Sequence, residues 1–421
     1  MTTTASTGPL SLLLKEWRLL VFGLLITFWS SPGQTFFISL FGGQIRTDLG
    51  LSHGGFGGIY SAATLASAFL MIWTGPLVDR IDLRKISVLV VAALAIGCGL
   101  LSISHTVPLL VLSIFLLRHA GQGLMFLCST TAMVRYLEPV KGKASSLSGM
   151  GYPLGEAILP SVIVMMLGAF AWRSSWQIFA VILLVLIVPL ILLLLRNHHL
   201  RHSQYLENLQ TASLNPDKAG RKTQWTRAEV VRDLKFYLFL PGLLSQPLMF
   251  TGFIFHQVHL VQSKGWSLSM WGSLFVIYAI VSVVFNLICG VLIDRYGASR
   301  ILPYFPIPLA IGLLTLSGAS SESAALVFMV LTGVTVGMSS PLSTPFFVEL
   351  YGSQHIGAIK SLSTATMVLF SALSPVVLGL FFDFGVSVET LAFCGALYIF
   401  LTSALAWWTC RKFVWKGPLF T

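Results

Sequence analysis

Apolar stretches of about twenty residues follow one another along almost the whole chain, separated by short polar turns. A stretch of that length, folded as an α-helix, crosses the roughly 30 Å of hydrocarbon in a bilayer. Charged residues make up only 10% of the chain and hydrophobic residues 55%, whereas about a quarter of a soluble domain is charged. The sequence therefore predicts an all-α integral membrane protein. It excludes a soluble enzyme, a coiled coil, a disordered chain and a disulfide scaffold.

Twelve such spans are predicted, in two sets of six. The first six cover about 17–42, 53–78, 86–104, 107–135, 143–168 and 173–196, and the second six about 236–262, 268–292, 300–319, 323–350, 356–382 and 387–410. A polar stretch, 197–235, separates the sets. We therefore expect an N-terminal six-helix bundle over 1–196, a cytoplasmic loop over 197–235 and a C-terminal six-helix bundle over 236–421.

The basic residues predict the orientation in the membrane. Of the 26 Lys and Arg residues, all fall in the termini or at the loops after even-numbered spans, except Arg46, Arg118, Arg173 and Lys264. Lys and Arg are retained on the cytoplasmic side. Both termini are therefore predicted to be cytoplasmic, in a multi-pass protein of the plasma membrane (a bacterial inner membrane). The net charge of +11 then reflects topology and lipid contact, and no nucleic-acid partner is expected.

The two sets of spans match at a constant offset of 215 residues. Pro32 matches Pro247, Gly75 to Arg80 matches Gly290 to Arg295, and Pro160 matches Pro375. Several matches at one offset indicate a parallel structural repeat.

The loop after the second span holds the most specific motif, Gly75-Pro-Leu-Val-Asp79-Arg80-Ile-Asp-Leu-Arg84-Lys85. It resembles the G-x-L-x-D-R-x-x-x-R-[RK] signature of the major facilitator superfamily, and Gly290 to Arg300, with Asp294 and Arg295, is a weaker copy. The resemblance covers essentially the whole chain. It implies two six-helix bundles around a central cavity, in a monomer whose substrate reaches one side of the membrane at a time.

The resemblance also implies a conformational gate, formed by Gly75, Asp79, Arg80, Arg84, Asp294 and Arg295. Asp79 lies at a cytoplasmic helix end, where its carboxylate can accept hydrogen bonds from the positive N-terminal end of another helix. In this family that helix is the eleventh span, which is predicted to begin near 355–358.

Two opposite charges are predicted near the membrane midplane, Arg118 in the fourth span and Glu156 in the fifth. An ionisable group at that depth costs roughly 2.5–3.5 kcal/mol or more, so each needs a reason. Three explanations remain open: an ion pair that joins the two helices, an anionic substrate bound by Arg118, and a coupling proton on Glu156. The second and third are compatible with the first.

Other predicted substrate-binding residues follow from helical spacing and polarity. Arg118 to Gly123 resembles the family's R-x-x-Q-G motif with one residue inserted, which adds Gln122. The remaining members are Gln34, Tyr152, Gln246, Tyr278 and Asn286. His256, near the outer end of the seventh span, is expected to be a hydrogen-bonded structural histidine.

The run from Ser31 to Phe41 and the Trp172-Arg173 pair with Trp176 loosely resemble bacterial monocarboxylate and organic anion porters. A proton-coupled monocarboxylate or other organic anion is therefore the predicted substrate. Proton-driven export of drugs, siderophores or metabolites is the alternative, in view of the glycines around Tyr152-Pro153 and the aromatic residues near the expected cavity. No enzyme motif is present, and no cofactor or metal is expected, including at the histidine-rich 196–202.

Overall fold

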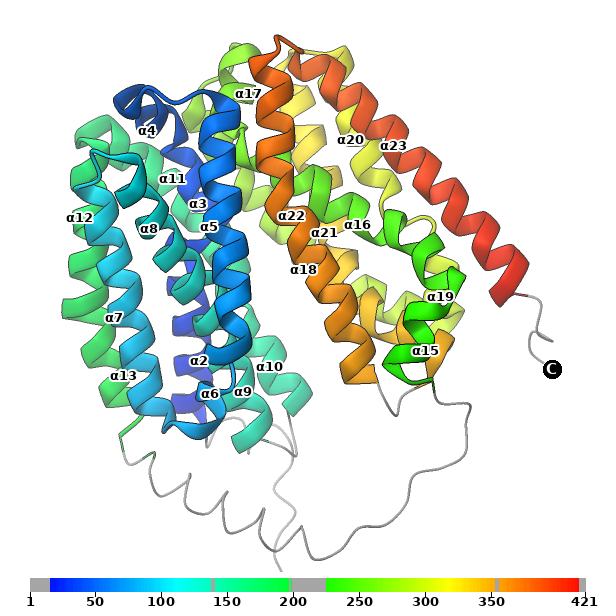
Figure 1. Cartoon of the computed structure of the whole chain (residues 1–421), viewed down its shortest axis with the longest axis horizontal. Coiled ribbons are helices and arrows are strands. Elements are labelled where there is room, and N and C mark those ends of the chain that lie inside the picture. The colour runs from blue at the N-terminus through cyan, green and yellow to red at the C-terminus, as the bar shows by residue number, and fades with distance from the viewer. Residues whose placement is uncertain (1–15, 138–140, 197, 199–224, 353–355, 416–421) are drawn as a thin grey trace, which may run out of the picture. The chain divides into compact units, whose positions relative to one another are not determined.

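The computed structural model describes residues 16–137, 141–196, 198, 225–352 and 356–415 (Figure 1). Within those ranges every regular element is a helix. The chain divides into two compact units. Unit 1 comprises Met1–Phe41 and Ala62–Asp217, and unit 2 comprises Gly42–Ser61 and Lys218–Thr421. Helix α5, His53–Thr74, is continuous and therefore begins in unit 2 and ends in unit 1.

Unit 1 holds the helices of the first repeat. They are α2 (Trp17–Trp29), the short 3₁₀ turn η1 (Ser31–Gly33), α3 (Thr35–Leu40), most of α5, α6 (Leu77–Arg80), α7 (Leu83–Ser102), α8 (Val107–Leu117), the π-helix η2 (Arg118–Met125), α9 (Phe126–Tyr136), α10 (Lys141–Gly149), α11 (Gly151–Ala169), α12 (Trp172–Ile182), the π-helix η4 (Leu183–Ile187) and α13 (Val188–Leu194).

Unit 2 holds the helices of the second repeat and the segment between α3 and the middle of α5. They are α4 (Gly42–Leu49), α15 (Arg227–Arg232), α16 (Leu234–Phe255), α17 (Gln257–Ser263), α18 (Leu268–Tyr296), α19 (Ala298–Ile301), α20 (Ile307–Gly318), α21 (Glu322–Tyr351), α22 (Ile356–Asp383), α23 (Val388–Thr409) and the π-helix η5 (Cys410–Val414). Helix α15 lies inside the stretch predicted as a polar loop. Its capping box between Thr226 and Glu229 forms its first turn, and Val230 is buried in the core of unit 2.

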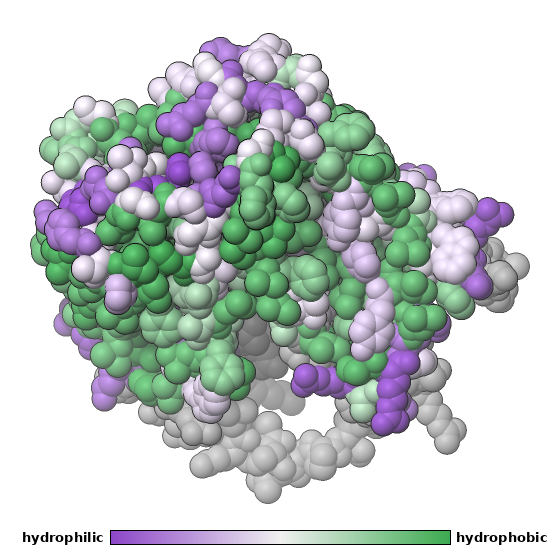
Figure 2. Space-filling model, turned by 45° about the horizontal axis from the view of Figure 1, so that its top comes forward, coloured by the Kyte–Doolittle hydropathy of each residue, from purple (hydrophilic) through white to green (hydrophobic). Residues whose placement is uncertain are grey.

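The membrane spans confirm the predicted fold class. Ten helices in the described part of the chain are long and apolar enough to cross a membrane, and Ile307–Gly318 is a shorter apolar helix. Pro32 and Gly33 interrupt the first predicted span, because η1 separates α2 from α3. Figure 2 shows apolar residues over most of the visible surface and hydrophilic ones in patches.

The same pairs of spans pack together in each unit, as a repeat requires. In unit 1, α2 packs on α9 and α11, and α7 packs on α8 and α12. In unit 2, the corresponding α16 packs on α21 and α22, and α20 packs on α21 and α23. The division between the units at Asp217 lies inside the polar stretch 197–235, but the predicted domain limits stay a prediction.

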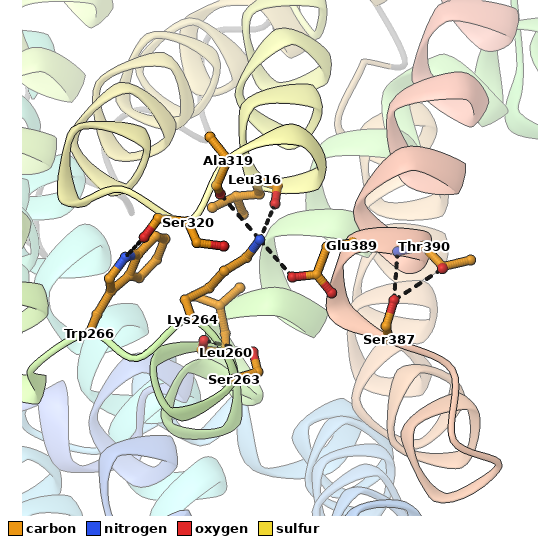
Figure 3. A network of polar contacts seen from close by, with 10 residues as sticks. All are labelled: Leu260, Ser263, Lys264, Trp266, Leu316, Ala319, Ser320, Ser387, Glu389 and Thr390. Atoms are coloured by element: carbon orange, nitrogen blue, oxygen red, sulfur yellow. Dashed lines mark hydrogen bonds and ion pairs between the residues drawn. The ribbon is translucent and has the colours of Figure 1, made fainter.

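A buried lysine ties three helices of unit 2 together at one end (Figure 3). The Lys264 ammonium donates to the backbone oxygens of Leu316 (2.6 Å) and Ala319 (3.2 Å) and pairs with Glu389 at 2.7 Å. The indole of Trp266 donates to Ser320 O at 2.7 Å. The end of α17, the turn after α20 and the start of α23 are therefore joined through polar contacts.

Candidate functional site

Arg118 lies at the centre of the site in unit 1, with a side chain 2% exposed. It begins the π-helix η2 inside the fourth span. Its Nε donates to Thr64 Oγ1 at 3.1 Å and its NH1 donates to Gly33 O at 2.9 Å. Single π-turns within α-helices are frequent at functional sites. Two fixed hydrogen bonds hold the planar guanidinium in one orientation, which is what bidentate recognition of a carboxylate needs.

Two glycines let η1 and η2 approach closely beside Arg118. A Cβ on Gly33 would lie 2.2 Å from Leu117 O, and a Cβ on Gly121 would lie 2.8 Å from both Gly33 Cα and Ser30 O. Because only glycine allows backbones to approach this closely, these two positions place Gly33 O within reach of the guanidinium. The break in the first span thus supplies the acceptor that Arg118 uses.

Glu156 is also buried, on α11, where its side chain is 3% exposed. The preceding residue, Gly155, packs against η1, since a Cβ there would lie 2.3 Å from Ser31 Oγ. Segment η1 therefore contacts both the element that bears Arg118 and the element that bears Glu156. Both predicted midplane charges lie in unit 1, and the ion pair between them stays a prediction.

The corresponding positions of unit 2 are uncharged. Arg118 matches Gly333, where a Cβ would lie 2.8 Å from Tyr278 O, so α18 and α21 are in close backbone contact there. Glu156 matches Ser371, whose hydroxyl lies 2.9 Å from Thr251 Oγ1. Neutral contacts thus replace both charges in the second repeat.

The other predicted substrate-binding residues are distributed over both units. In unit 1, Gln34 is buried at the start of α3, Tyr152 is half-buried with its ring edge-on to Phe36, and Gln122 is exposed. In unit 2, Tyr278 is buried and stacks on Phe250 at 5.8 Å between ring centroids. Gln246 is half-buried on α16, and Asn286 is exposed on α18. Thus Gln34 lies next to the break that contacts Arg118.

The predicted gate residues occupy helix ends. Gly75 directly follows α5, and Asp79 and Arg80 are the last two residues of α6. Arg84 is exposed in the first turn of α7, where Asp82 accepts hydrogen bonds from two backbone amides. Asp294 and Arg295 are exposed at the end of α18.

The predicted contact between Asp79 and the start of the eleventh span, near 355–358, involves residue 355 and side chains that lie outside the described part of the structure. Most of 196–202 also lies outside it. Elsewhere in the part of the chain that is described, no three His, Cys, Asp or Glu residues are arranged to hold a metal ion.

Sequence reasoning missed several polar partners. His119 Nδ1 lies 3.2 Å from Ser67 O and its Nε2 lies 3.1 Å from Thr74 Oγ1, so α5 supplies partners to Arg118 and to His119. Lys360, half-buried at the start of α22, donates to Thr344 Oγ1, and burial lowers the pKa of its amine. The available signal for the partners of Arg118 and His119 was the presence of Thr64 and Thr74 in the otherwise apolar helix α5.

Comparison with known proteins agrees with this architecture. The family model described as Major Facilitator Superfamily matches residues 23–258 and 242–415. A solved structure of a bacterial homologue of the human lysosomal transporter Spinster, inward-facing and unoccupied, is 14% identical, has a TM-score of 0.70, and covers 96% of this chain and 99% of its own. The nucleoside transporter NupG is 14% identical with a TM-score of 0.70, covering 95% of this chain and 99% of its own. No curated protein sequence matches significantly.

Proposed function

Because the chain belongs to the major facilitator superfamily, we propose that it is a proton-coupled secondary transporter of a small organic anion. A monocarboxylate is the substrate class that we favour. It is an integral, multi-pass membrane protein with a transporter fold. The proposal places it in the bacterial inner membrane as a monomer with both termini in the cytoplasm. Substrate would reach a site in the protein from one side of the membrane at a time.

The orientation of Arg118 is the observation that supports an anionic substrate. A guanidinium is charged at every physiological pH, and this one is buried in a membrane span with hydrogen bonds to two neutral acceptors, Thr64 Oγ1 and Gly33 O. A permanent charge at membrane depth is costly unless an anion lies near it. A carboxylate substrate or a buried carboxylate such as Glu156 can meet this need.

Glu156 is proposed to take the coupling proton. When Glu156 is ionised, it competes with substrate for the positive charge of Arg118. Protonation of Glu156 removes that competitor and favours binding of a carboxylate, so that proton and anion move together. This scheme needs one cation and one titratable carboxyl in the same unit, and both are buried in unit 1.

A thermal-shift screen of the detergent-purified protein tests the substrate class. It compares monocarboxylates, dicarboxylates, amino acids, siderophores and lipophilic cations. A ligand at about 100 times its dissociation constant adds roughly 2.7 kcal/mol to the stability of the native state. We expect stabilisation by monocarboxylates in the wild type and none in Arg118→Ala.

Two further variants separate the roles of the charges. Arg118→Lys keeps the charge but loses the planar fork, so we expect weak residual binding. Glu156→Gln mimics the protonated carboxyl, so anion binding should persist and lose its dependence on pH. Stabilisation by bulky apolar or siderophore ligands that is equal in the wild type and in Arg118→Ala would instead favour the exporter. Arg118 would then have a structural role.

A further inference from the structure

A carboxylate of α22 caps the start of α5. Asp383, the last residue of α22, accepts hydrogen bonds from the backbone N–H groups of His53 (2.9 Å) and Gly54 (2.8 Å). These are amides at the positive end of a 22-residue helix, where a negative charge is favourable. One turn later the backbones nearly touch, since a Cβ on Gly57 would lie 2.4 Å from Pro375 O. The first turns of α5 are thus tied to α22.

Three imidazoles surround this cap. The ring centroid of His53 lies 4.3 Å from that of His259 and 5.7 Å from that of His256. The ring of Phe382, the neighbour of Asp383, packs against all three imidazoles at 4.7–5.8 Å. The cluster therefore joins α5, α17 and the end of α22 within unit 2.

One hydrogen bond, burial and a nearby positive charge favour neutral imidazoles in this cluster. His256 Nε2 donates to Pro375 O at 2.9 Å, as expected for a structural histidine, and burial lowers its pKa to about 3. Burial, and then the positive charge of Arg46, lowers the pKa of His259. The Nδ1 atom of His53 is buried and has no hydrogen-bond partner among the described residues. The arrangement is thus built around neutral imidazoles.

The charged groups that face the cluster come from each neighbouring helix. Helix α4 contributes the half-buried Arg46, and the exposed Asp48 lies further along the same helix. From α22 it is Asp383, whose two oxygens are engaged by α5. Helix α17 contributes His259 and no carboxylate. A proton added to the His53–His259 pair is therefore repelled by the positive charge of Arg46 and by the other imidazole, and it is attracted by the carboxylate of Asp383.

We propose that the His53–His259 pair, packed beside the structural His256, forms a proton-sensitive latch that controls whether Asp383 holds the start of α5 on α22. With neutral imidazoles the latch is closed. Acid adds positive charge beside Arg46 and draws the Asp383 carboxylate away from the backbone of α5, which releases the first turns of the helix. Since α5 continues into unit 1, the latch can transmit the pH on one side of the membrane to a helix that contacts Arg118. This holds whichever solute is transported.

The direction of the pH effect follows from proton binding. An imidazole whose pKa is lowered in the closed latch binds its proton more readily when released, where the value is near 6.5. The open form then binds more protons, so the latch is stable above about pH 6.5 and weakens as the pH falls below it. One such imidazole changes the closed-to-open ratio about tenfold between pH 7.5 and 5.5.

Hydrogen–deuterium exchange of the full chain in detergent tests this without any substrate, so its outcome is separate from that of the transport proposal. The readout is the protection factor of the His53 and Gly54 amides, which corrects for the intrinsic pH dependence of exchange. We expect it to fall about tenfold from pH 7.5 to 5.5 in the wild type. The start of α18, capped by the Ser267 hydroxyl at Met270 N, is the internal reference and should stay constant.

Variants then assign the effect to the cluster. His53→Gln with His259→Gln should give a protection factor that no longer depends on pH, and Asp383→Ala should lose protection at both pH values. His105→Gln, at an exposed histidine outside the cluster, is the matched control and should keep the wild-type profile. A flat profile in the wild type overturns the proposal whatever the variants do. A pH response that survives in the double variant overturns it as well.

Discussion

Replacing Lys264 with Met tests whether its polar contacts stabilise unit 2. The side chain is almost fully buried, and methionine keeps its length and apolar stem while removing the three donors of the ammonium. Three acceptors are affected: Leu316 O at 2.6 Å, Ala319 O at 3.2 Å and Glu389 Oε1 at 2.7 Å.

The cost is unequal among these three acceptors. Leu316 is fully buried, and a buried carbonyl left without a donor costs about 1–3 kcal/mol. Ala319 is exposed, so water replaces the lost donor. The Glu389 side chain is 40% exposed, and an ion pair screened by solvent contributes at most about 1 kcal/mol. We therefore expect Lys264→Met to destabilise the protein by about 2–3 kcal/mol, mostly through Leu316 O.

The assay is thermal unfolding in detergent, followed by tryptophan fluorescence, with Glu389→Gln as the matched variant. At about 2–4 °C per kcal/mol for a unit of this size, Lys264→Met should lower the apparent midpoint by about 5–10 °C. Glu389→Gln should lower it by no more than about 4 °C. Equal losses in the two variants would show that the ion pair, and not the buried carbonyl, is the stabilising contact.

Two further predictions concern the contacts of Arg118. Gly121→Val should destabilise unit 1 by about 1–3 kcal/mol, because its Cβ would meet the backbone of Gly33. The control is Gly99→Ala, at a position where nothing lies within 4 Å of an added Cβ, and it should change the unfolding midpoint by less than 3 °C. An equal effect at both sites would contradict the close approach of Gly121 to Gly33. Thr64→Val removes the acceptor of the Arg118 Nε–H, a hydrogen bond to a charged group worth about 1.5–3 kcal/mol, so anion affinity in the thermal-shift titration should fall by about ten- to a hundredfold. Unchanged affinity would exclude this contact from substrate binding.

The hydropathy pattern predicted much of the fold, because span length and loop charge depend on the bilayer and not on packing. The break at Pro32 was visible as a proline in a span, but its consequence was not. Whether a proline bends a helix or interrupts it depends on the neighbours that satisfy the freed backbone groups. Here Gly33 O is satisfied by Arg118, a contact over 85 residues that no local pattern encodes.

The neighbours of the predicted site residues were harder to foresee, for the same reason. Helical spacing places polar residues on one face but does not say which neighbour they meet, so the exposed positions of Gln122 and Asn286 could not be foreseen. The latch was invisible in the sequence because His53, His259 and Asp383 are far apart along the chain. Their proximity arises only once α5 packs on α22.

Transport in proteoliposomes tests the central claim most directly, that Arg118 binds an organic anion which moves together with a proton. A pH-sensitive dye inside the vesicles reports proton entry when a monocarboxylate is added outside, with Arg118→Ala and Glu156→Gln reconstituted in parallel. We predict acidification in the wild type, none in Arg118→Ala, and none in Glu156→Gln, although Glu156→Gln still binds the anion. Acidification of equal size in Arg118→Ala, or a wild type that responds only to apolar or cationic solutes, would contradict the account.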